Sequence, residues 1–511
     1  MYMNKQCDNA NSYKKTNQLS MFSSTFPLFF LLMLYLVGIP LWIIILIGIW
    51  YFSIISLEST GYLDKIDATR VLGFILMIRT KKGKSILDRI SSFKRFWKFF
   101  GEISIWICLS VMALVVFVLL ISAFSTILNP REEYIPASDV LFIPGVTSFV
   151  PFWWPVIALI VTLVIHEYSH GIQARVHGMR LKSFGLLLMG PLPLGAFAEP
   201  EQDEMIRAPR RERMRLFAAG PSINIFATYI AVILLAFVST GLVSNQEGLH
   251  IREIIEGEPA QEAGLAPYEA IIEINGTEIT DYDSFSSTLN DTSPGDEIVF
   301  KVLTFPSEDG FRDEKEVSVV MGDRFEHFNS ICEQNNDYER CMSFYGNPEP
   351  GKSFLGVDIA EDIVAAKRYS IILQGNFGIV DRLVYTLVTP VIMLFEPMSL
   401  DGQTMIIEER QLLEVEGFIP ESIGKENVLR IFDFLFWLVW VNFLLGFANL
   451  VPMVPFDGGH IVKDAIHSIL RRISSRHPIK IENFANKISN YSSFFFLIII
   501  LLPLISPIFP W

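Results

Sequence analysis

Long apolar runs alternate with charged stretches along this 511-residue chain. A helix needs roughly 20 apolar residues to cross the hydrocarbon core of a membrane. Six runs meet that requirement, at residues 27–56, 101–127, 152–176, 214–240, 429–452 and 491–510. The pattern therefore predicts a polytopic α-helical membrane protein of six spans, with a soluble α+β domain inserted between the fourth and fifth.

A seventh apolar run, at 383–395, is too short to cross a bilayer. It also contains Pro390, which interrupts helical hydrogen bonding. A full crossing here would place the last basic loop of the chain outside the cell, against the usual bias of lysine and arginine. We therefore predict a re-entrant or interfacial segment on the outer face, within residues 376–428.

The stretch between the first two spans carries a cluster of positive charge, which favours the cytoplasmic side. Its basic residues are Arg79, Lys81, Lys82, Lys84, Arg89, Lys94, Arg95 and Lys98. Aromatic residues are interleaved with them. Beside a span this mixture favours an amphipathic segment on the anionic inner leaflet over a nucleic-acid partner. Alternation of the spans then places residues 245–370 outside the cell.

Composition agrees with a membrane protein, since 51% of the residues are hydrophobic and the mean hydropathy is +0.39. The predicted organisation has seven parts: an N-terminal region with a membrane anchor (1–70), the basic segment (71–100), a first part of the membrane core (101–243), a compact soluble domain (244–322), an acidic extracytoplasmic extension (323–375), the re-entrant or interfacial segment (376–428) and a second part of the membrane core (429–511).

Short alternating strands such as "LHIREI" and "AIIEING" lie between turn residues in the soluble domain. A helix is predicted at 281–290, capped by Asp281 or Asp283. The pattern "EPAQEAGL…IIEINGTEI…PGDEIVFKV" resembles the PDZ fold, which implies that a peptide or protein terminus is bound by strand addition. The alternative is a spacer that binds nothing. In the acidic extension, Cys332 and Cys341 could form a disulfide outside the cell.

The third span contains "HEYSH" at residues 166–170. Residues four apart share one helix face, so His166 and His170 can ligate one metal ion while Glu167 acts as a general base. Ionisable groups inside a membrane must satisfy one another or face water, and a metal ion meets that requirement. The alternative is a pair of buried histidines that hydrogen-bond to neighbours.

A third ligand is expected from "NLVPMVPFDGGH", at the end of the fifth span. Its prolines break the helix, and irregular backbone at membrane depth is tolerated where it lines a polar cavity. Asp457 would complete a set of two histidines and one aspartate that binds one Zn²⁺ per chain. His460 is the competing ligand, and a simple capped turn is the remaining alternative.

The pair "HEYSH" and "NLVPMVPFDGG" resembles the motifs of the site-2 protease family of intramembrane zinc metalloproteases. Between them, "LFAAGPSINIF" is similar to the family's Gly-Pro-x-x-Asn motif, with Gly220, Pro221 and Asn224. The stretch "GPLPLGAFAEPE" is similar to its membrane-associated β-hairpin. The resemblance covers roughly residues 70 to 511.

This resemblance implies zinc-dependent cleavage within or near transmembrane segments of other membrane proteins, in regulated intramembrane proteolysis or signal-peptide clearance. It implies that Gly195, Ala196 and Phe197 hold the unwound substrate as an added strand, and that Asn449 binds the substrate backbone. The strand could instead plug the cavity. Asn224 would lie beside the metal site and orient a ligand or the packing of the helix. The expected location is a cell membrane, with the PDZ-like domain extracytoplasmic and the active site towards the cytoplasmic half.

Three alternatives remain open. The chain could be a non-catalytic membrane scaffold that binds peptides through the PDZ-like domain. It could be a membrane protease with a downstream glutamate ligand, but this leaves the "NLVPMVPFDGG" segment without a purpose. It could be a transporter, in which case the zinc-ligand spacing would be a coincidence.

Overall fold

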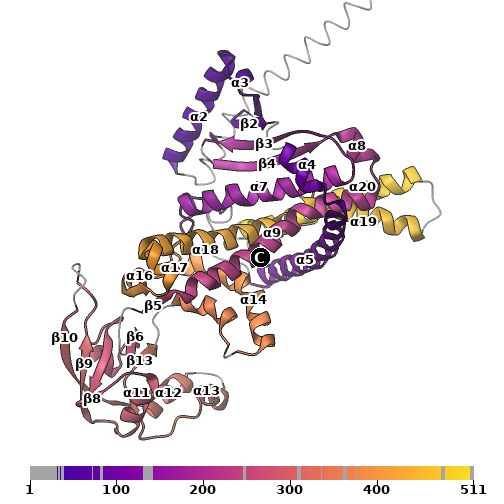
Figure 1. The fold of residues 1–511 in the computed structure, drawn as a ribbon. Coiled ribbons are helices and arrows are strands. Elements are labelled where there is room, and N and C mark those ends of the chain that lie inside the picture. Colours follow the sequence, from indigo (N-terminus) through magenta and orange to yellow (C-terminus); the bar gives the residue numbers. More distant parts are fainter. Residues whose placement is uncertain are drawn as a thin grey trace, which may run out of the picture. The chain divides into compact units, whose positions relative to one another are not determined.

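The computed structural model describes most of the chain. The described residues are 31–32, 35, 40–71, 73–80, 84–129, 142–190, 192–244, 249–307, 312–334, 337–360, 365–375, 377–473 and 478–506. They form two compact units (Figure 1). Unit 1 comprises Met1–Ile233, Thr386–Gly402 and Asp433–Trp511, and unit 2 comprises Leu234–Tyr385 and Gln403–Phe432.

Six helices among the described residues are long and apolar enough to cross a membrane. They are α2 (Leu41–Ser59), α5 (Lys94–Leu128), α7 (Trp153–Val176), α9 (Arg210–Thr240), α18 (Lys425–Ala448) and the stretch Lys480–Pro503 of α20 (Pro478–Ile505). Each overlaps one predicted span, so the prediction of a polytopic helical membrane protein is confirmed. The beginning of the first predicted span, at 27–30, lies outside the described residues.

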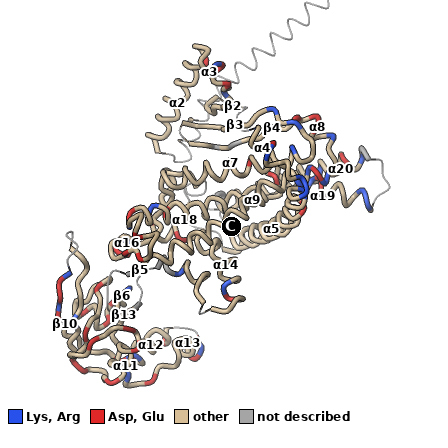
Figure 2. Tube along the Cα trace, in the orientation of Figure 1, with Lys and Arg blue, Asp and Glu red and all other residues tan. Residues whose placement is uncertain are grey.

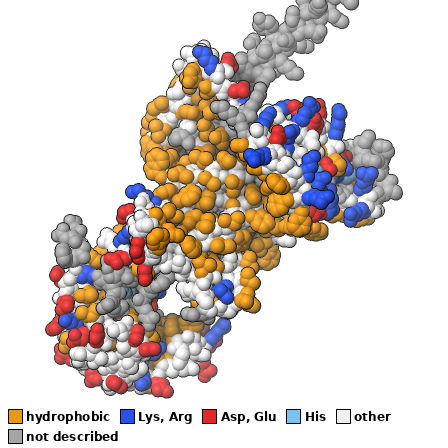
Figure 3. Space-filling model, in the orientation of Figure 1, with side chains coloured by type: hydrophobic (Ala, Val, Ile, Leu, Met, Phe, Trp, Pro, Cys, Tyr) orange, Lys and Arg blue, Asp and Glu red, His pale blue; other side chains and the backbone are white. Residues whose placement is uncertain are grey.

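The outer surface of these helices is apolar. On α5, for example, Trp106, Phe117 and Phe124 are exposed, and Figure 3 shows hydrophobic side chains covering the helices of unit 1. Exposed apolar surface of this extent marks contact with lipid or protein. The exposed side chains of these helices therefore form the kind of apolar surface that a bilayer would cover.

The short apolar run predicted to be re-entrant or interfacial forms α14 (Ile379–Met393), with Pro390 inside the helix. At 15 residues it would span about 22 Å at 1.5 Å per residue, less than the ~30 Å hydrocarbon core. A shorter helix, α15 (Glu396–Ser399), follows it. That this segment does not cross, and that it lies on the outer face, stays a prediction.

Unit 1 contains a four-stranded antiparallel sheet with the order β1-β2-β3-β4. Its strands are β1 (Ala68–Val71), β2 (Ile75–Thr80), β3 (Leu181–Met189) and β4 (Leu192–Pro200). The predicted hairpin is β3–β4. The sequence analysis does not predict β1 or β2. Among the described strands β1 pairs only with β2, and the other partner of β2 is β3, about a hundred residues further on.

A shared core holds this sheet against α7. Leu87 of α4 (Lys84–Ser91) packs with Ile172 of α7 and Phe184 of β3. The ring of Tyr168 stacks on Phe184 at a centroid distance of 5.0 Å. Gly171 permits this approach, since a Cβ there would lie 2.9 Å from the Leu87 side chain. The sheet and α4 thereby fix the position of the helix that carries "HEYSH".

Unit 1 contains three further helices. α3 (Tyr62–Lys65) precedes the sheet, α8 (Gln202–Arg207) follows it, and α19 (Asp457–Ile473) lies between α18 and α20 in the chain.

Unit 2 is built on a six-stranded antiparallel sheet, with the order β10-β9-β7-β6-β13 and β8 paired to β7. The strands are β6 (Leu249–Ile254), β7 (Ala270–Ile274), β8 (Thr277–Glu278), β9 (Glu297–Leu303), β10 (Glu314–Val320) and β13 (Val357–Ala360). The strands expected from "LHIREI" and "AIIEING" are confirmed as β6 and β7. The sheet also includes β13, which lies beyond residue 322, where the sequence analysis ended the domain.

Two helices pack on this sheet, α10 (Pro259–Glu262) and α11 (Tyr282–Asn290). Asp281 caps α11, and its carboxylate accepts a hydrogen bond from the backbone N–H of Ser284 at 2.7 Å. The predicted helix at 281–290 is confirmed with this cap. Phe285 of α11 joins the sheet core, which includes Ile271, Phe300 and Val319.

The segment between β10 and β13 forms a small helical insertion. It contains β11 (Gly322–Asp323), α12 (Arg324–Glu333), α13 (Tyr338–Phe344) and β12 (Ser353–Phe354). A disulfide joins Cys332 to Cys341, as the sequence allowed. The rest of unit 2 includes β5 (Leu242–Ser244) paired with β14 (Leu413–Val415), the 3₁₀ helix η1 (Ala365–Leu373), α16 (Ile407–Leu412) and α17 (Phe418–Ile423).

The disulfide restricts the unfolded chain, and since the loop that it closes is short we expect it to stabilise the insertion by only about 2–3 kcal/mol. Replacing both cysteines (Cys332→Ser with Cys341→Ser) should speed amide hydrogen exchange in α12 and α13 of the full chain. Exchange in α11 should stay unchanged and serves as the internal control. Unaltered protection of α12 and α13 would show that packing alone holds them.

Candidate metal centre

Helix α7 places two histidine side chains together in the interior of unit 1. The Nε2 atoms of His166 and His170 lie 3.1 Å apart, and both residues are buried. The carboxylate of Glu167 belongs to the same group, whose ligand atoms all lie within 4.8 Å of one another. The spacing of four residues has thus produced the expected shared face.

Asp457, the first residue of α19, places its carboxylate beside the Nε2 atoms of both histidines. Its Oδ2 lies 3.2 Å from Nε2 of His166 and 3.4 Å from Nε2 of His170. The two glycines that follow are required by close packing. A Cβ on Gly458 would lie 2.6 Å from a backbone oxygen of the preceding loop, and one on Gly459 would lie 2.5 Å from its backbone atoms.

The donor atoms fit a zinc ion by their separations. Zinc bonds of about 2.0–2.1 Å at tetrahedral angles set neighbouring ligand atoms roughly 3.3 Å apart. The three separations among His166, His170 and Asp457 are 3.1, 3.2 and 3.4 Å. Two imidazoles and one carboxylate are also a donor set that zinc enzymes use, with a fourth position left open.

The opposite ring nitrogens of both histidines have partners on α9. Nδ1 of His170 lies 2.7 Å from the backbone carbonyl oxygen of Leu216, to which it donates a hydrogen bond. That bond leaves Nε2 with its lone pair available for a metal ion. Sequence reasoning missed Leu216, because a backbone carbonyl leaves no signal in the residue type.

Asn224 is buried next to His166, with its side-chain amide nitrogen 2.9 Å from Nδ1. Its amide oxygen is buried and has no partner among the described residues. With the amide turned half a rotation, the oxygen would accept a hydrogen bond from Nδ1–H of His166. A proton on Nδ1 leaves the lone pair of Nε2 free, which is the form of His166 that can bind a metal ion.

Gly220 of α9 leaves room for the ion. A Cβ at this position would lie 2.4 Å from Nε2 of His170 and 2.6 Å from Nε2 of His166. The glycine of the "GPSIN" stretch therefore keeps the metal-facing atoms of both rings uncovered.

Glu167 points from α7 to the sheet. Its Oε2 accepts a hydrogen bond from the backbone N–H of Ala198 in β4, at 2.8 Å. β4 is an edge strand and carries the predicted substrate-binding residues Gly195, Ala196 and Phe197. A cavity of about 220 Å³ lies beside Glu167 and is lined by Phe197 and Gly185 among others. The general-base candidate and the candidate substrate strand thus lie next to each other.

Two further predicted residues lie outside this group. The side-chain amide of Asn449 donates to the backbone carbonyl of Leu445, one turn earlier in α18. The ring of His460 stacks on Phe217 at 4.4 Å. By contrast, a carboxylate oxygen of Asp457 lies within 3.4 Å of Nε2 of both histidines. The geometry therefore favours Asp457 over His460 as the third ligand.

Sequence comparisons identify the family to which the chain is similar. The sequence model of peptidase family M50 matches residues 154–500. The uncharacterized protein MJ0971 of Methanocaldococcus jannaschii is 30% identical over 240 residues, which is 47% of this chain and 62% of that protein, so the match spans less than two thirds of that relative.

Two further relatives are named as metalloproteases. The putative zinc metalloprotease Cj1068 of Campylobacter jejuni is 23% identical over 65% of this chain and 88% of its own length. The zinc metalloprotease Rip1 of Mycobacterium tuberculosis is 21% identical over 66% of this chain and 89% of its own length.

Adding a methyl group at Gly220 should prevent metal binding while leaving α9 helical. We expect the Gly220→Ala protein to contain much less zinc than the wild type, measured by elemental mass spectrometry after purification in detergent. Gly48→Ala is the matched control, because a Cβ there would meet no atom within 4 Å. Full zinc content in Gly220→Ala would contradict this geometry.

Proposed function

The chain belongs to peptidase family M50, and from this premise we propose that it is a zinc-dependent protease that hydrolyses peptide bonds within or near transmembrane segments of other membrane proteins. The observation that carries the proposal is that Asp457 of α19 meets His166 and His170 beside Glu167. The two histidines and Glu167 lie on α7, whose other residues are mostly apolar.

His166, His170 and Asp457 would hold the zinc ion. A bound zinc ion supplies Lewis acidity, which makes a water molecule a nucleophile near neutral pH and polarises the scissile carbonyl. Asn224 and the Leu216 carbonyl fix the two imidazole rings so that Nε2 of each faces this point. Partners of this kind typically tune metal affinity by about 10–100-fold.

Glu167 moves the proton. Its carboxylate takes a proton from the attacking water as the new carbon–oxygen bond forms, and gives it to the leaving nitrogen as the carbon–nitrogen bond breaks. Its present hydrogen bond to Ala198 holds the carboxylate towards β4. The proton carrier is therefore held beside the strand that would present the substrate.

A substrate helix hides its carbonyl groups in its own hydrogen bonds, so it must unwind before hydrolysis. The edge strand β4 can receive the unwound chain by β-augmentation along Gly195–Phe197. In an antiparallel strand, alternate residues direct their N–H groups to the same side. The N–H of Ala198 points away from β3, to Glu167. Ala196, two residues earlier, therefore directs its backbone N–H and C=O to the same open side, where a substrate strand could pair with them. Asn449 would add a contact to the substrate backbone.

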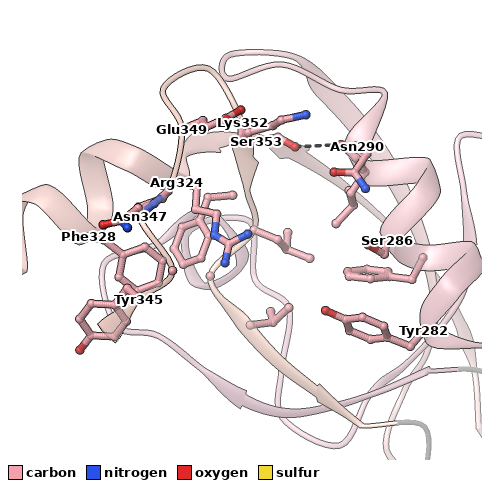
Figure 4. Close-up of a pocket in the computed structure, with 18 residues that line it drawn as sticks. Tyr282, Ser286, Asn290, Arg324, Phe328, Tyr345, Asn347, Glu349, Lys352 and Ser353 are labelled. Atoms are coloured by element: carbon pink, nitrogen blue, oxygen red, sulfur yellow. Dashed lines mark hydrogen bonds between the residues drawn. The ribbon is translucent and has the colours of Figure 1, made fainter. Parts of the chain in front are cut away.

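Unit 2 would act as a PDZ-like peptide-binding domain on the extracytoplasmic side, with the active site towards the cytoplasmic half of the membrane. A groove of about 530 Å³ runs between α11 and the segment that leads into β13. In Figure 4 the guanidinium of Arg324 points into this groove, between Phe328 and Tyr282. β13 is an edge strand, and an arginine at the end of a groove beside it suits a peptide carboxylate.

The non-catalytic scaffold is the competing function. It accounts for the groove of unit 2, but it gives no reason for an ionisable carboxylate at Glu167. Placing such a charge at the centre of a membrane helix costs about 2.5–3.5 kcal/mol on insertion scales. A protein without catalysis gains nothing from that cost.

Cleavage of a model transmembrane substrate in detergent tests the proposal. Glu167→Gln should keep its zinc and lose activity by about 100-fold or more, since general acid–base catalysis contributes at least that much. Asp457→Asn should lose both zinc and activity, while His460→Gln should keep both. Cleavage by Glu167→Gln at the wild-type rate, or a zinc-free folded wild type, would overturn the proposal and leave the scaffold as the better account.

The groove of unit 2 makes a separate prediction about peptide termini. The immobilised full chain should retain random hexapeptides with free carboxyl termini better than the same pool with amidated termini, measured by mass spectrometry of the eluate. Arg324→Gln should abolish this preference, and Arg340→Gln, on α13 outside the groove, should preserve it. Equal retention of both pools by the wild type would indicate that unit 2 does not recognise a terminus.

A further inference from the structure

A second pocket in unit 1 lies away from the metal centre, where α8, the start of α9, the end of α19 and the start of α20 meet. Its volume is about 780 Å³. Five arginines and one histidine line it: Arg207, Arg210, Arg213, Arg471, Arg472 and His467. Figure 2 shows lysine and arginine gathered around α8 and α19, and Figure 3 shows their side chains on the surface there.

The pocket carries more positive than negative charge. Glu482, the one acidic residue in its lining, pairs with Arg210 at 2.6 Å. Arg213 pairs with Asp464 behind it. Within the described parts of the chain, no ion pair is found for Arg207, Arg471 or Arg472. Three guanidinium groups around the pocket are therefore available to a ligand.

A buried imidazole in the lining points to the same conclusion. His467 is only 2% exposed, yet neither of its ring nitrogens has a hydrogen-bond partner among the described residues. Its nearest acidic atom, on Glu482, is 3.5 Å away. Nε of Arg210 is likewise buried without a hydrogen-bond partner among the described residues, and an oxygen of Asp464 is 4.0 Å away from it. Buried donors without partners are costly and rare, so a ligand with several acceptor oxygens would satisfy them.

The position of the pocket favours an anion from the membrane surface. Arg210 is the first residue of α9, and the positive end of that long helix dipole points at the pocket. Both α9 and α20 become apolar within a few turns of it and are long enough to cross a bilayer. A pocket at this level of the helices lies where phospholipid headgroups would be found.

We infer that this pocket binds a phosphate group, either in the headgroup of an anionic phospholipid or as free phosphate. One guanidinium group can donate two parallel hydrogen bonds to two oxygens of a phosphate group. The ring of His467 supplies a further N–H donor from the buried side of the pocket. The site is distinct from the metal centre and does not depend on proteolysis. It would tie the cytoplasmic ends of α9, α19 and α20 to the lipid composition of the membrane.

Native mass spectrometry of the delipidated full chain in a neutral detergent tests this inference. The probes are phosphatidylglycerol, phosphatidylcholine, in which a choline cation offsets the phosphate charge, and inorganic phosphate. The wild type should retain phosphatidylglycerol in preference to phosphatidylcholine. Arg471→Gln with Arg472→Gln should weaken that binding roughly tenfold or more, since hydrogen bonds to charged groups are among the strong ones.

Two further variants make the result specific. His467→Phe keeps the ring volume and removes both nitrogens, so it should also weaken binding. Arg252→Gln with Arg340→Gln removes the same charge from exposed positions of β6 and α13 in unit 2, outside the pocket, and should leave binding unchanged. If the pocket pair and the control pair weaken lipid binding equally, or if neither weakens it, the inference is wrong. Binding would then not depend on the arginines of this pocket.

Competition identifies the source of the phosphate. Displacement of phosphatidylglycerol by millimolar inorganic phosphate would support a site for the free anion. Retention of the lipid against inorganic phosphate would support a lipid site. Wild-type protein that binds neither probe more tightly than phosphatidylcholine would exclude both.

Discussion

The requirement to compensate charge inside an apolar helix bundle governs the structure around the metal centre. Two imidazoles and two carboxylates from α7 and α19 meet among buried side chains, where an isolated charge would be costly. A zinc ion would satisfy three of them at once, which would explain why α7, α9 and α19 are held in register. A side chain at Gly220, Gly458 or Gly459 would clash with neighbouring atoms, so the glycines allow the helices to pack in that register.

The fourth group, Glu167, connects the metal centre to the sheet. Its hydrogen bond to Ala198 makes the edge strand β4 part of the site. The core formed by α4, α7 and β3 then becomes important for chemistry as well as for folding, because a shift of the sheet would move the strand relative to the proton carrier. The residues that pack behind β3 are therefore supports of the proposed mechanism.

Much of this was accessible from the sequence. Apolar runs located the six long helices, and the spacings in "HEYSH" and "FDGG" identified residues that the fold brings together. Asp281 was recognisable as a helix cap, and Cys332 and Cys341 as a possible pair. Three features were not accessible. The pairing of β2 with β3 and the position of β13 in the unit 2 sheet depend on contacts between segments far apart in the chain. The bond from His170 uses the backbone of Leu216, which residue identity cannot reveal.

The central claim is that two imidazoles and one carboxylate of this chain hold a single zinc ion. X-ray absorption at the zinc edge, measured on the purified full chain, tests it most directly. The account predicts two imidazole nitrogens with the remaining ligands oxygen, at about 2.0–2.2 Å. Asp457→Asn should lose most of the zinc signal, and His460→Gln should keep the wild-type spectrum. A spectrum with three imidazoles that becomes one with two in His460→Gln would contradict the account.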